Sequence, residues 1–385
     1  MAPLPDRIAA WRNRLLADTA FRGKLQRLPF GRGIARRRAR ALFAINVGFI
    51  NSQVLAALLE LDLLERLASG PASAEELARE LAGEPDGGQT LDPLRLERLL
   101  EAGAELDLTE PRRKSRWGLG SQGAVLASDP GLLAMSLHHR ALYTDLADPV
   151  ALLRQDPPPT ELSRLWPYAV TDQPQAIEAQ DTKRYTALMA ASQRMIAEQV
   201  LGAFDFSPFD RLLDVGGGSG AFLAAVGKAH ADLSLGLFDL PGVIPHAAEN
   251  LEAAGLGPRL ALHGGNFHED ALPTGYDLIS LVRIVHDHDD DPARQLLEKA
   301  FEALPPGGTL LLAEPLTGRG DRDGLVGNYF RFYLMAMGSG RPRTARELRR
   351  TLKKTGFHRI RHHRTDIPLI CSVLSARKPD AGQAT

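Results

Sequence analysis

The sequence predicts a two-domain α/β fold, in which a helical, winged-helix-like region precedes a parallel sheet of about seven strands. From about residue 205 onward, apolar strands alternate with amphipathic helices, the pattern of a parallel sheet with helical crossovers. Residues 41–140 instead read as helical and close with a segment that suits a short hairpin. A chain of 385 residues is long for one core and fits two or three domains.

Composition narrows the class of protein. Hydrophobic residues make up 44% and charged residues 24% of the chain, values typical of a globular protein with a sizeable core. The net charge of −1 gives no overall attraction to nucleic acid or to anionic membranes. The single cysteine, Cys371, excludes an internal disulfide framework, and its alternating apolar neighbours predict a packed, inert thiol. With no secretory signal pattern, we expect a cytoplasmic protein.

The first 40 residues form a basic arm. They hold eleven Arg and Lys against two acidic residues. Ile8, Trp11, Leu15 and Leu16 recur at helical spacing with arginines between them, so the arm could lie on an anionic membrane surface. A solvated, partly disordered arm is the alternative, and the sequence leaves both open.

The helical region that follows carries several helix-start signals. Residues 41–64 are apolar but contain too many polar residues for a membrane span, and they predict a buried helix. Ser73 and Glu76 form a capping box, and Asp92 precedes a proline that suits a first helical position. A winged helix can bind DNA, but acids alternate with arginines in its second helix, so a DNA-binding regulator is disfavoured.

The predicted sheet domain has a clear order of strands. The strand candidates are residues 211–215, 235–240, 259–264, 277–285, 309–315, 358–365 and 369–376. A second capping box, Thr344 to Glu347, starts a helix between the fifth and sixth strands. With the proline-rich connection at 154–168, these patterns divide the chain into the arm (1–40), a helical domain (41–165) and a sheet domain (166–385).

A glycine-rich turn follows the first strand of the sheet domain. Gly216, Gly218 and Gly220 allow the backbone to turn sharply and to approach a ligand closely. Gly216 and Gly218 with Ala221 also satisfy a dinucleotide fingerprint, so a nicotinamide enzyme has to be weighed. Asp214 favours another ligand, because a carboxylate two residues before the first glycine suits a cationic amino-acid group better than a phosphate.

Further polar residues follow the second and third strands. Asp239 lies about twenty residues beyond the turn, where a carboxylate can accept both ribose hydroxyls. Asn266 could read an adenine edge, with Phe267 packing on the ring. Carboxyl ends of parallel strands meet at one edge, so a nucleoside with an amino-acid tail fits best. The sequence therefore predicts a Rossmann-like domain that binds S-adenosylmethionine.

These motifs resemble, in order, those of the class I small-molecule O-methyltransferases typified by the caffeate and acetylserotonin enzymes. The matching segments are LLDVGGGSG, FDLPGV, GGNF, VRIVHDHDDD, PPGGTLLLAEP and RTARELRRTLKKTGF. The resemblance covers the chain from about residue 41 and implies that the helical region is a dimerisation domain of a homodimer. It also implies that Leu240 and Met189 contact the cofactor, with Tyr185 nearby.

Three segments are most similar to the family's bacterial members that act on carotenoids: RALYTDLADPVALL, RLWPYA and YFRFYLMAMGSGRPRT. This resemblance implies a long hydroxylated carotenoid, methylated on its terminal tertiary hydroxyl, and peripheral contact with the inner, photosynthetic membrane. The aromatic and Met residues of 328–338 could form an apolar wall for a polyene, or plain core. A quinol, polyketide or phenolic substrate, a non-enzymatic S-adenosylmethionine-binding regulator, and a family fold turned to decarboxylation or hydroxylation are the alternatives.

The segment RIVHDHDDDP (283–292) holds the candidate catalytic residue. The resemblance implies that His286 is the general base and that Glu314, on the neighbouring strand, orients it. Asn266, His288 and Pro342 depart from the plant members of the family, where a carboxylate, an aromatic residue and a second acid stand. The alternating His and Asp residues lack a second ligand cluster, so we expect no metal, and Asp291 is predicted to cap the next helix.

Overall fold

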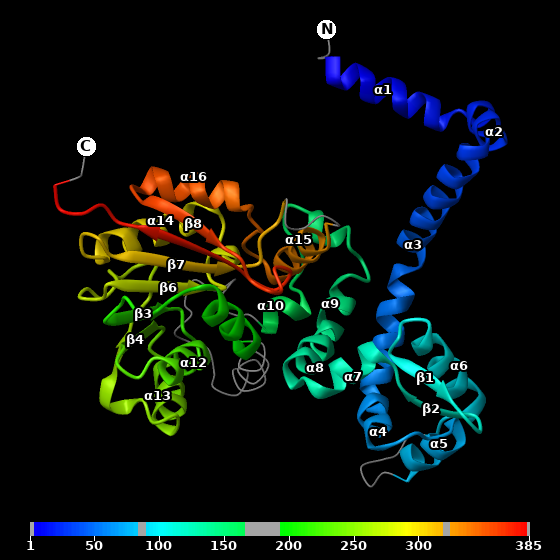
Figure 1. Ribbon diagram of the computed structural model, residues 1–385, viewed down its shortest axis with the longest axis horizontal. Coiled ribbons are helices and arrows are strands. Elements are labelled where there is room, and N and C mark those ends of the chain that lie inside the picture. The colour runs from blue at the N-terminus through cyan, green and yellow to red at the C-terminus, as the bar shows by residue number, and fades with distance from the viewer. Residues whose placement is uncertain (1–3, 84–89, 166–192, 319–323, 383–385) are drawn as a thin grey trace. The chain divides into compact units, whose positions relative to one another are not determined.

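The computed structural model describes residues 4–83, 90–165, 193–318 and 324–382 (Figure 1). The chain divides into two compact units, Met1–Ser128 and Asp129–Thr385. Residues 129–165, which the sequence grouped with the helical domain, therefore pack in the second unit. Met189 and Tyr185 lie outside the described residues.

The first unit is a helical domain with a small hairpin. The side chain of Ser73 accepts the Glu76 N–H in a complete capping box, and Asp92 accepts the Leu94 N–H, so both predicted caps are confirmed. The predicted hairpin is confirmed as an antiparallel pair. Its elements are α1 (Leu4–Ala17), α2 (Thr19–Arg27), α3 (Pro29–Glu60), α4 (Leu63–Ser69), α5 (Ala74–Ala82), α6 (Pro93–Ala104), β1 (Thr109–Arg112), β2 (Arg116–Leu119) and α7 (Ser121–Ser128).

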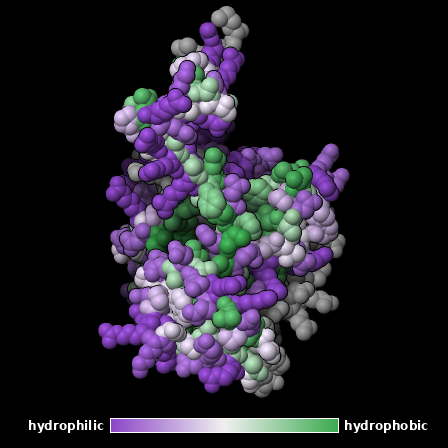
Figure 2. Space-filling view, turned by 90° about the vertical axis from the view of Figure 1, so that its right-hand side faces the viewer, coloured by the Kyte–Doolittle hydropathy of each residue, from purple (hydrophilic) through white to green (hydrophobic). Residues whose placement is uncertain are grey.

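The long helix α3 differs from the expectation of a buried helix. Leu58 and Leu59 at its end are buried, but Phe43 and Ile45 are 67% and 78% exposed in the single chain. Apart from Gly31, the buried residues of α3 are Leu58 and Leu59 near its C-terminal end, so Phe43 and Ile45 are left largely uncovered by the described part of the chain. Figure 2 shows apolar side chains among the hydrophilic ones on these N-terminal helices. By length and composition alone, α3 could also cross a membrane.

The second unit contains a seven-stranded sheet within the described residues, in the order β5-β4-β3-β6-β7-β9-β8. All pairs are parallel except those of β9, which runs antiparallel to both of its neighbours. The sheet therefore confirms the predicted Rossmann-like domain. Its strands are β3 (Arg211–Val215), β4 (Ser234–Asp239), β5 (Leu260–Gly264), β6 (Leu278–Val282), β7 (Thr309–Glu314), β8 (His358–His363) and β9 (Ser372–Arg377).

Helices cover both faces of this sheet, and two apolar cores lie between the layers. Strand order reverses between β3 and β6, and such a switch point leaves a crevice for a ligand at the carboxyl ends of the strands. The helices are α8 (Pro130–Leu137), α9 (His139–Asp145), α10 (Glu161–Leu165), α12 (Ala221–Ala229), α13 (Ile244–Ala253), α14 (Asp290–Ala303), α15 (Leu325–Met337) and α16 (Ala345–Thr355), with short 3-10 turns at Ala151–Leu153, Gly257–Arg259 and Val285–Asp287.

Two helix starts test the predicted caps of this unit. The capping box of Thr344 and Glu347 is confirmed at the start of α16. The prediction that Asp291 caps α14 is wrong, because the helix begins at Asp290 and its N-cap is Asp289. The carboxylate of Asp289 accepts the N–H of Gly340 and makes no capping hydrogen bond to its own helix.

Candidate functional site

The glycine-rich turn leads from β3 into α12 in a conformation that favours glycine. Gly216, Gly218 and Gly220 have φ angles of 72°, 55° and 78°, in the left-handed region. A Cβ atom on Gly216 would stand 2.6 Å from the Ile284 side chain, too close to be accommodated without movement. The turn therefore needs glycine at these positions, and it keeps the backbone open toward a ligand.

Asp239, at the end of β4, is held against the same turn. One carboxylate oxygen accepts the Gly218 N–H at 2.7 Å, and the other accepts the Leu240 N–H at 2.7 Å. Each carboxylate oxygen can accept two hydrogen bonds, so one acceptor site on each stays available for a ribose hydroxyl. Burial raises the pKa of Asp239, while the two backbone N–H groups lower it.

Asp214 is buried beneath the turn. Ser280 on β6 donates a hydrogen bond to its carboxylate at 2.6 Å, and the two residues are register partners in the sheet. Burial raises the pKa of Asp214 to about 7; Ser280 lowers it in part, and nearby Asp239 raises it further. A cationic group bound here would favour the ionised carboxylate, so the residues fit the ammonium of an amino-acid moiety.

Asn266 and Phe267 follow β5 at the same edge. The Asn266 side-chain oxygen accepts the His268 N–H, which leaves its amide N–H groups available as donors. Phe267 packs partly against the core, with its ring centroid 5.3 Å from that of His288. The pKa of His288 is lowered to about 3, chiefly by burial. The neutral imidazole of His288 therefore packs edge-on against Phe267 as an aromatic ring would, at the position where plant members carry an aromatic residue.

His286 and Glu314 are brought together at the ends of β6 and β7. His286 Nδ1 lies 2.5 Å from Glu314 Oε2, and both side chains are buried. The other oxygen of Glu314 accepts the N–H groups of Ile284 and Val285 at 3.1 and 2.8 Å. An ionised carboxylate only accepts hydrogen bonds, so Nδ1 carries the proton and the lone pair of a neutral imidazole stands at Nε2.

The same carboxylate explains why β6 is shorter than the predicted 277–285. The strand ends at Val282, after which Arg283 adopts a φ of 59° and the chain turns so that its next two N–H groups face Glu314. Apolar residues continue to Val285, so the sequence pattern alone could not show where the strand ends.

Asp287 is a residue whose place sequence reasoning missed. Its Oδ1 lies 3.1 Å from Nε2 of His286, and burial raises the pKa of Asp287 while His286 and Arg283 lower it. With the imidazole proton at Nδ1, this contact is a hydrogen bond only when Asp287 carries a proton, and Nε2 is free for a substrate hydroxyl only when the Asp287 side chain turns away. The only sequence signal was its position directly after the histidine.

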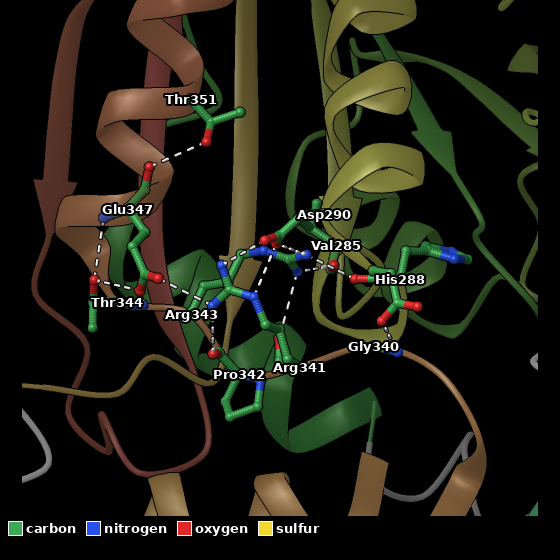
Figure 3. Close-up of polar contacts among 11 residues, drawn as sticks. Val285, His288, Asp290, Gly340, Arg341, Pro342, Arg343, Thr344, Glu347 and Thr351 are labelled. Atoms are coloured by element: carbon green, nitrogen blue, oxygen red, sulfur yellow. Dashed lines mark hydrogen bonds and ion pairs between the residues drawn. The ribbon is translucent and has the colours of Figure 1, made fainter. Parts of the chain in front are cut away.

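A strap of residues 340–343 supports the His286 loop from behind (Figure 3). The Arg341 N–H donates to the His286 carbonyl at 2.9 Å, and Arg343 donates to the carbonyls of Val285 and His288. Both arginines also bind Asp290, and they lower its pKa. Pro342, at the position of the family's second acid, offers no carboxylate, so the strap positions the loop through its two arginines.

Helix α15 forms an apolar wall on the other side of His286. The ring of Phe330 stands edge-on to the His286 ring, with centroids 5.6 Å apart, and the Arg283 guanidinium lies 5.3 Å from the Phe330 centroid. Tyr333 and Met337 lie in a core with residues of α9 and α10. The predicted aromatic stripe is therefore partly core and partly the surroundings of His286. Across the described residues, no cluster of three or more potential metal ligands forms.

The chain matches two sequence models of one family. The O-methyltransferase domain matches residues 143–358, more than half of the chain, and the O-methyltransferase dimerisation domain matches residues 44–129. The chain belongs to the O-methyltransferase family. It is an S-adenosylmethionine-dependent O-methyltransferase that forms a homodimer, and the exposed apolar residues of α3 from residue 44 onward fall within its dimerisation domain.

Relatives and solved structures agree with this assignment. The O-methyltransferase is 42% identical to the demethylspheroidene O-methyltransferase of Cereibacter sphaeroides, over 95% of this chain and 94% of the relative. It is 41% identical to the Rhodobacter capsulatus enzyme of that name, over 92% and 86%. Its fold is similar to human N-acetylserotonin methyltransferase in complex with S-adenosylmethionine (TM-score 0.70, 23% identity, 89% and 98% covered).

Proposed function

We propose that this O-methyltransferase methylates the terminal tertiary hydroxyl of a hydroxylated carotenoid. The observation that carries this proposal is the identity of 42% over nearly the whole length of an enzyme named demethylspheroidene O-methyltransferase. The apolar wall of α15 beside His286 supports it, because a surface of aromatic side chains suits a long polyene.

In this proposal the chain's own residues hold the cofactor and move one proton. The glycine turn, Asp239, Leu240, Asn266 and Phe267 bind the nucleoside, and Asp214 faces the amino-acid group. When bound, S-adenosylmethionine supplies an electrophilic methyl group.

His286 Nε2 then accepts the proton of the hydroxyl, and Glu314 stabilises the imidazolium that forms. An alcohol is far less acidic than an imidazolium, so His286 takes the proton only as the hydroxyl becomes an ether. Much of the rate must therefore come from positioning.

Methyl transfer from labelled cofactor to a panel of detergent-solubilised hydroxycarotenoids, quinols and catechols tests the substrate class. We expect the label in a hydroxycarotenoid that carries a tertiary hydroxyl. Transfer to a quinol or a catechol with no product from any carotenoid would refute the proposal.

We also propose that the enzyme is cytoplasmic and binds peripherally to the membrane that holds this insoluble substrate. Helix α1 supports this, because Ile8 and Trp11 are 57% and 63% exposed and share one face with Leu15. Arg7, Arg12 and Arg14 flank that face. Such a helix can insert its apolar face below the headgroups while its arginines bind anionic lipid.

A further inference from the structure

A second basic surface lies in the catalytic unit, apart from His286. Helix α16 and the edge strand β8 pack side by side (Figure 1), and a groove with a volume of about 1550 Å³ opens between them. Leu316, Val326 and Pro368 contribute its apolar lining. We refer to it as the basic groove.

Positive charge is concentrated in the basic groove. None of the described residues that line it is acidic, and six carry a positive charge: Arg346, Arg349, Arg350, Lys353, Lys354 and Arg359. Within the described part of the chain, these six side chains have no ion-pair or hydrogen-bond partner. These six cations around one hollow repel one another, so the groove suits an anionic partner.

Protection of the sheet edge does not account for this charge. Charged residues on an edge strand do prevent other strands from pairing with it, and β8 is such a strand. However, five of the six cations come from α16 and only Arg359 comes from β8. Arg359 has a φ of 48° and lies where the register between β8 and β9 shifts, a local irregularity that redirects a side chain.

Exposed apolar side chains flank the basic groove. Ile367 and Leu369, on either side of Pro368, are 43% and 51% exposed, and Leu325 at the start of α15 is 62% exposed. The loop is held in place, because the Ile367 N–H donates to Gln199 and the Thr365 hydroxyl donates to the Cys371 carbonyl. Unpaired cations beside exposed aliphatic residues are typical of a lipid interface, whereas a nucleic-acid surface would offer aromatic or polar side chains.

We propose that the basic groove docks the catalytic unit onto an anionic lipid bilayer. Its cations bind lipid phosphates, and Ile367 and Leu369 insert at the acyl boundary. This inference rests on the proposed carotenoid substrate. Val326 lines the groove, and Phe330 lies one helical turn further along α15 beside His286. The surface that docks on lipid therefore includes part of α15, the same helix that contacts the catalytic histidine.

A fluorescent probe on the loop tests this docking in the full chain. An environment-sensitive fluorophore is attached at Leu369→Cys; the native Cys371 is buried and stays unlabelled. We expect a blue shift with vesicles of phosphatidylglycerol and phosphatidylcholine, and none with phosphatidylcholine alone. The same probe at Glu252→Cys, on α13 beside the opposite edge strand β5, should stay in water.

Changing the charge of residues in the basic groove tests whether the groove causes the probe response. The triple variant Arg349→Glu, Arg350→Glu, Lys353→Glu should raise the lipid concentration for the half-maximal shift by roughly tenfold or more. If the charge reversal disturbs folding, a milder variant that only removes the charges replaces it: Arg349→Gln, Arg350→Gln, Lys353→Gln. It should also raise the lipid concentration for the half-maximal shift. Reversal of three other exposed cations, Arg113, Lys114 and Lys228, should leave the probe response unchanged.

The possible outcomes test the docking proposal separately from the proposed substrate. If the chain sediments with vesicles but the Leu369→Cys probe does not respond, the arm alone binds lipid and the docking proposal is overturned. A probe response to a soluble polyanion such as DNA, without one to vesicles, overturns it as well. Methyl transfer to a detergent-solubilised hydroxycarotenoid tests the proposed substrate by itself, and the triple variant should retain it.

Discussion

Replacing Glu314 by glutamine separates the charge of this residue from its shape. The amide oxygen of glutamine can still accept the N–H groups of Ile284 and Val285, so the end of β6 should keep its conformation. The amide nitrogen cannot accept the Nδ1 proton of His286, which now lies 2.5 Å from a carboxylate oxygen. The proton should therefore move to Nε2, where the base needs a lone pair.

The size of the effect follows from the burial of the pair. Both side chains are almost completely excluded from water, so no solvent molecule replaces the lost acceptor. An amide in place of the carboxylate behind a catalytic histidine lowers kcat by about 10⁴-fold where it has been measured in serine proteases. Methyl transfer depends more on the positioning of the reactants than peptide hydrolysis does, so we expect a loss of about 10²–10⁴-fold in kcat.

The assay is single-turnover methyl transfer from labelled cofactor, with cofactor affinity measured by calorimetry. S-adenosylmethionine binding should be unchanged, because the hydrogen bonds of Glu314 go to Ile284, Val285 and His286 and not to the glycine turn. Glu302→Gln, an exposed acid at the end of α14, is the matched control and should retain full activity. A kcat for Glu314→Gln within a few fold of the native enzyme would refute the base assignment.

Four further predictions concern the same unit and the arm. His286→Ala should lower kcat about 10²–10⁴-fold with intact cofactor binding, whereas His288→Ala should cost much less; kinetics on both variants checks this. Asp239→Ala should weaken S-adenosylmethionine binding by about 2–4 kcal/mol in calorimetry, and an unchanged affinity would place the ribose elsewhere. The raised pKa of Asp214, about 7, leaves the free carboxyl protonated below that pH, so affinity should rise about tenfold per pH unit from pH 5 to 7 and then level off. Asp214→Asn should flatten that profile; a pH-independent native affinity contradicts the pairing. Deleting residues 1–40 should reduce sedimentation with anionic liposomes, as should added salt, and equal sedimentation would mean a solvated arm.

Local signals in the sequence predicted much of the fold. Capping residues act within one turn of a helix, which is why the boxes at Ser73 and Thr344 could be identified without the structure. The strands of the sheet also follow from short apolar runs. In contrast, the side chain of Asp289, the N-cap of α14, accepts the N–H of Gly340 about fifty positions away, and no local pattern records that contact.

In the candidate site, too, some residues could be placed from local sequence patterns and others could not. His286, Glu314 and Asp239 stand at strand ends, so their motifs carried enough information to place them at one edge. Ser280 lies opposite Asp214 only because β3 pairs with β6, and that register is set by the whole sheet. The exposed apolar face of α3 could not be foreseen either. A helix that its own chain buries and a helix that its own chain leaves exposed have the same pattern of apolar residues.

Two segments lie beside the catalytic histidine, the strap of residues 340–343 and helix α15, and they should differ in how well they tolerate substitutions. A Cβ atom on Gly340 would stand 2.3 Å from the His286 carbonyl oxygen, so even alanine there should displace the loop. Helix α15, on the other side, contacts the His286 ring with the ring of Phe330, which stands nearly perpendicular to it. Libraries aimed at new acceptor alcohols should therefore diversify α15 and leave the glycine and arginines of the strap untouched, because variation on that side would alter every substrate alike.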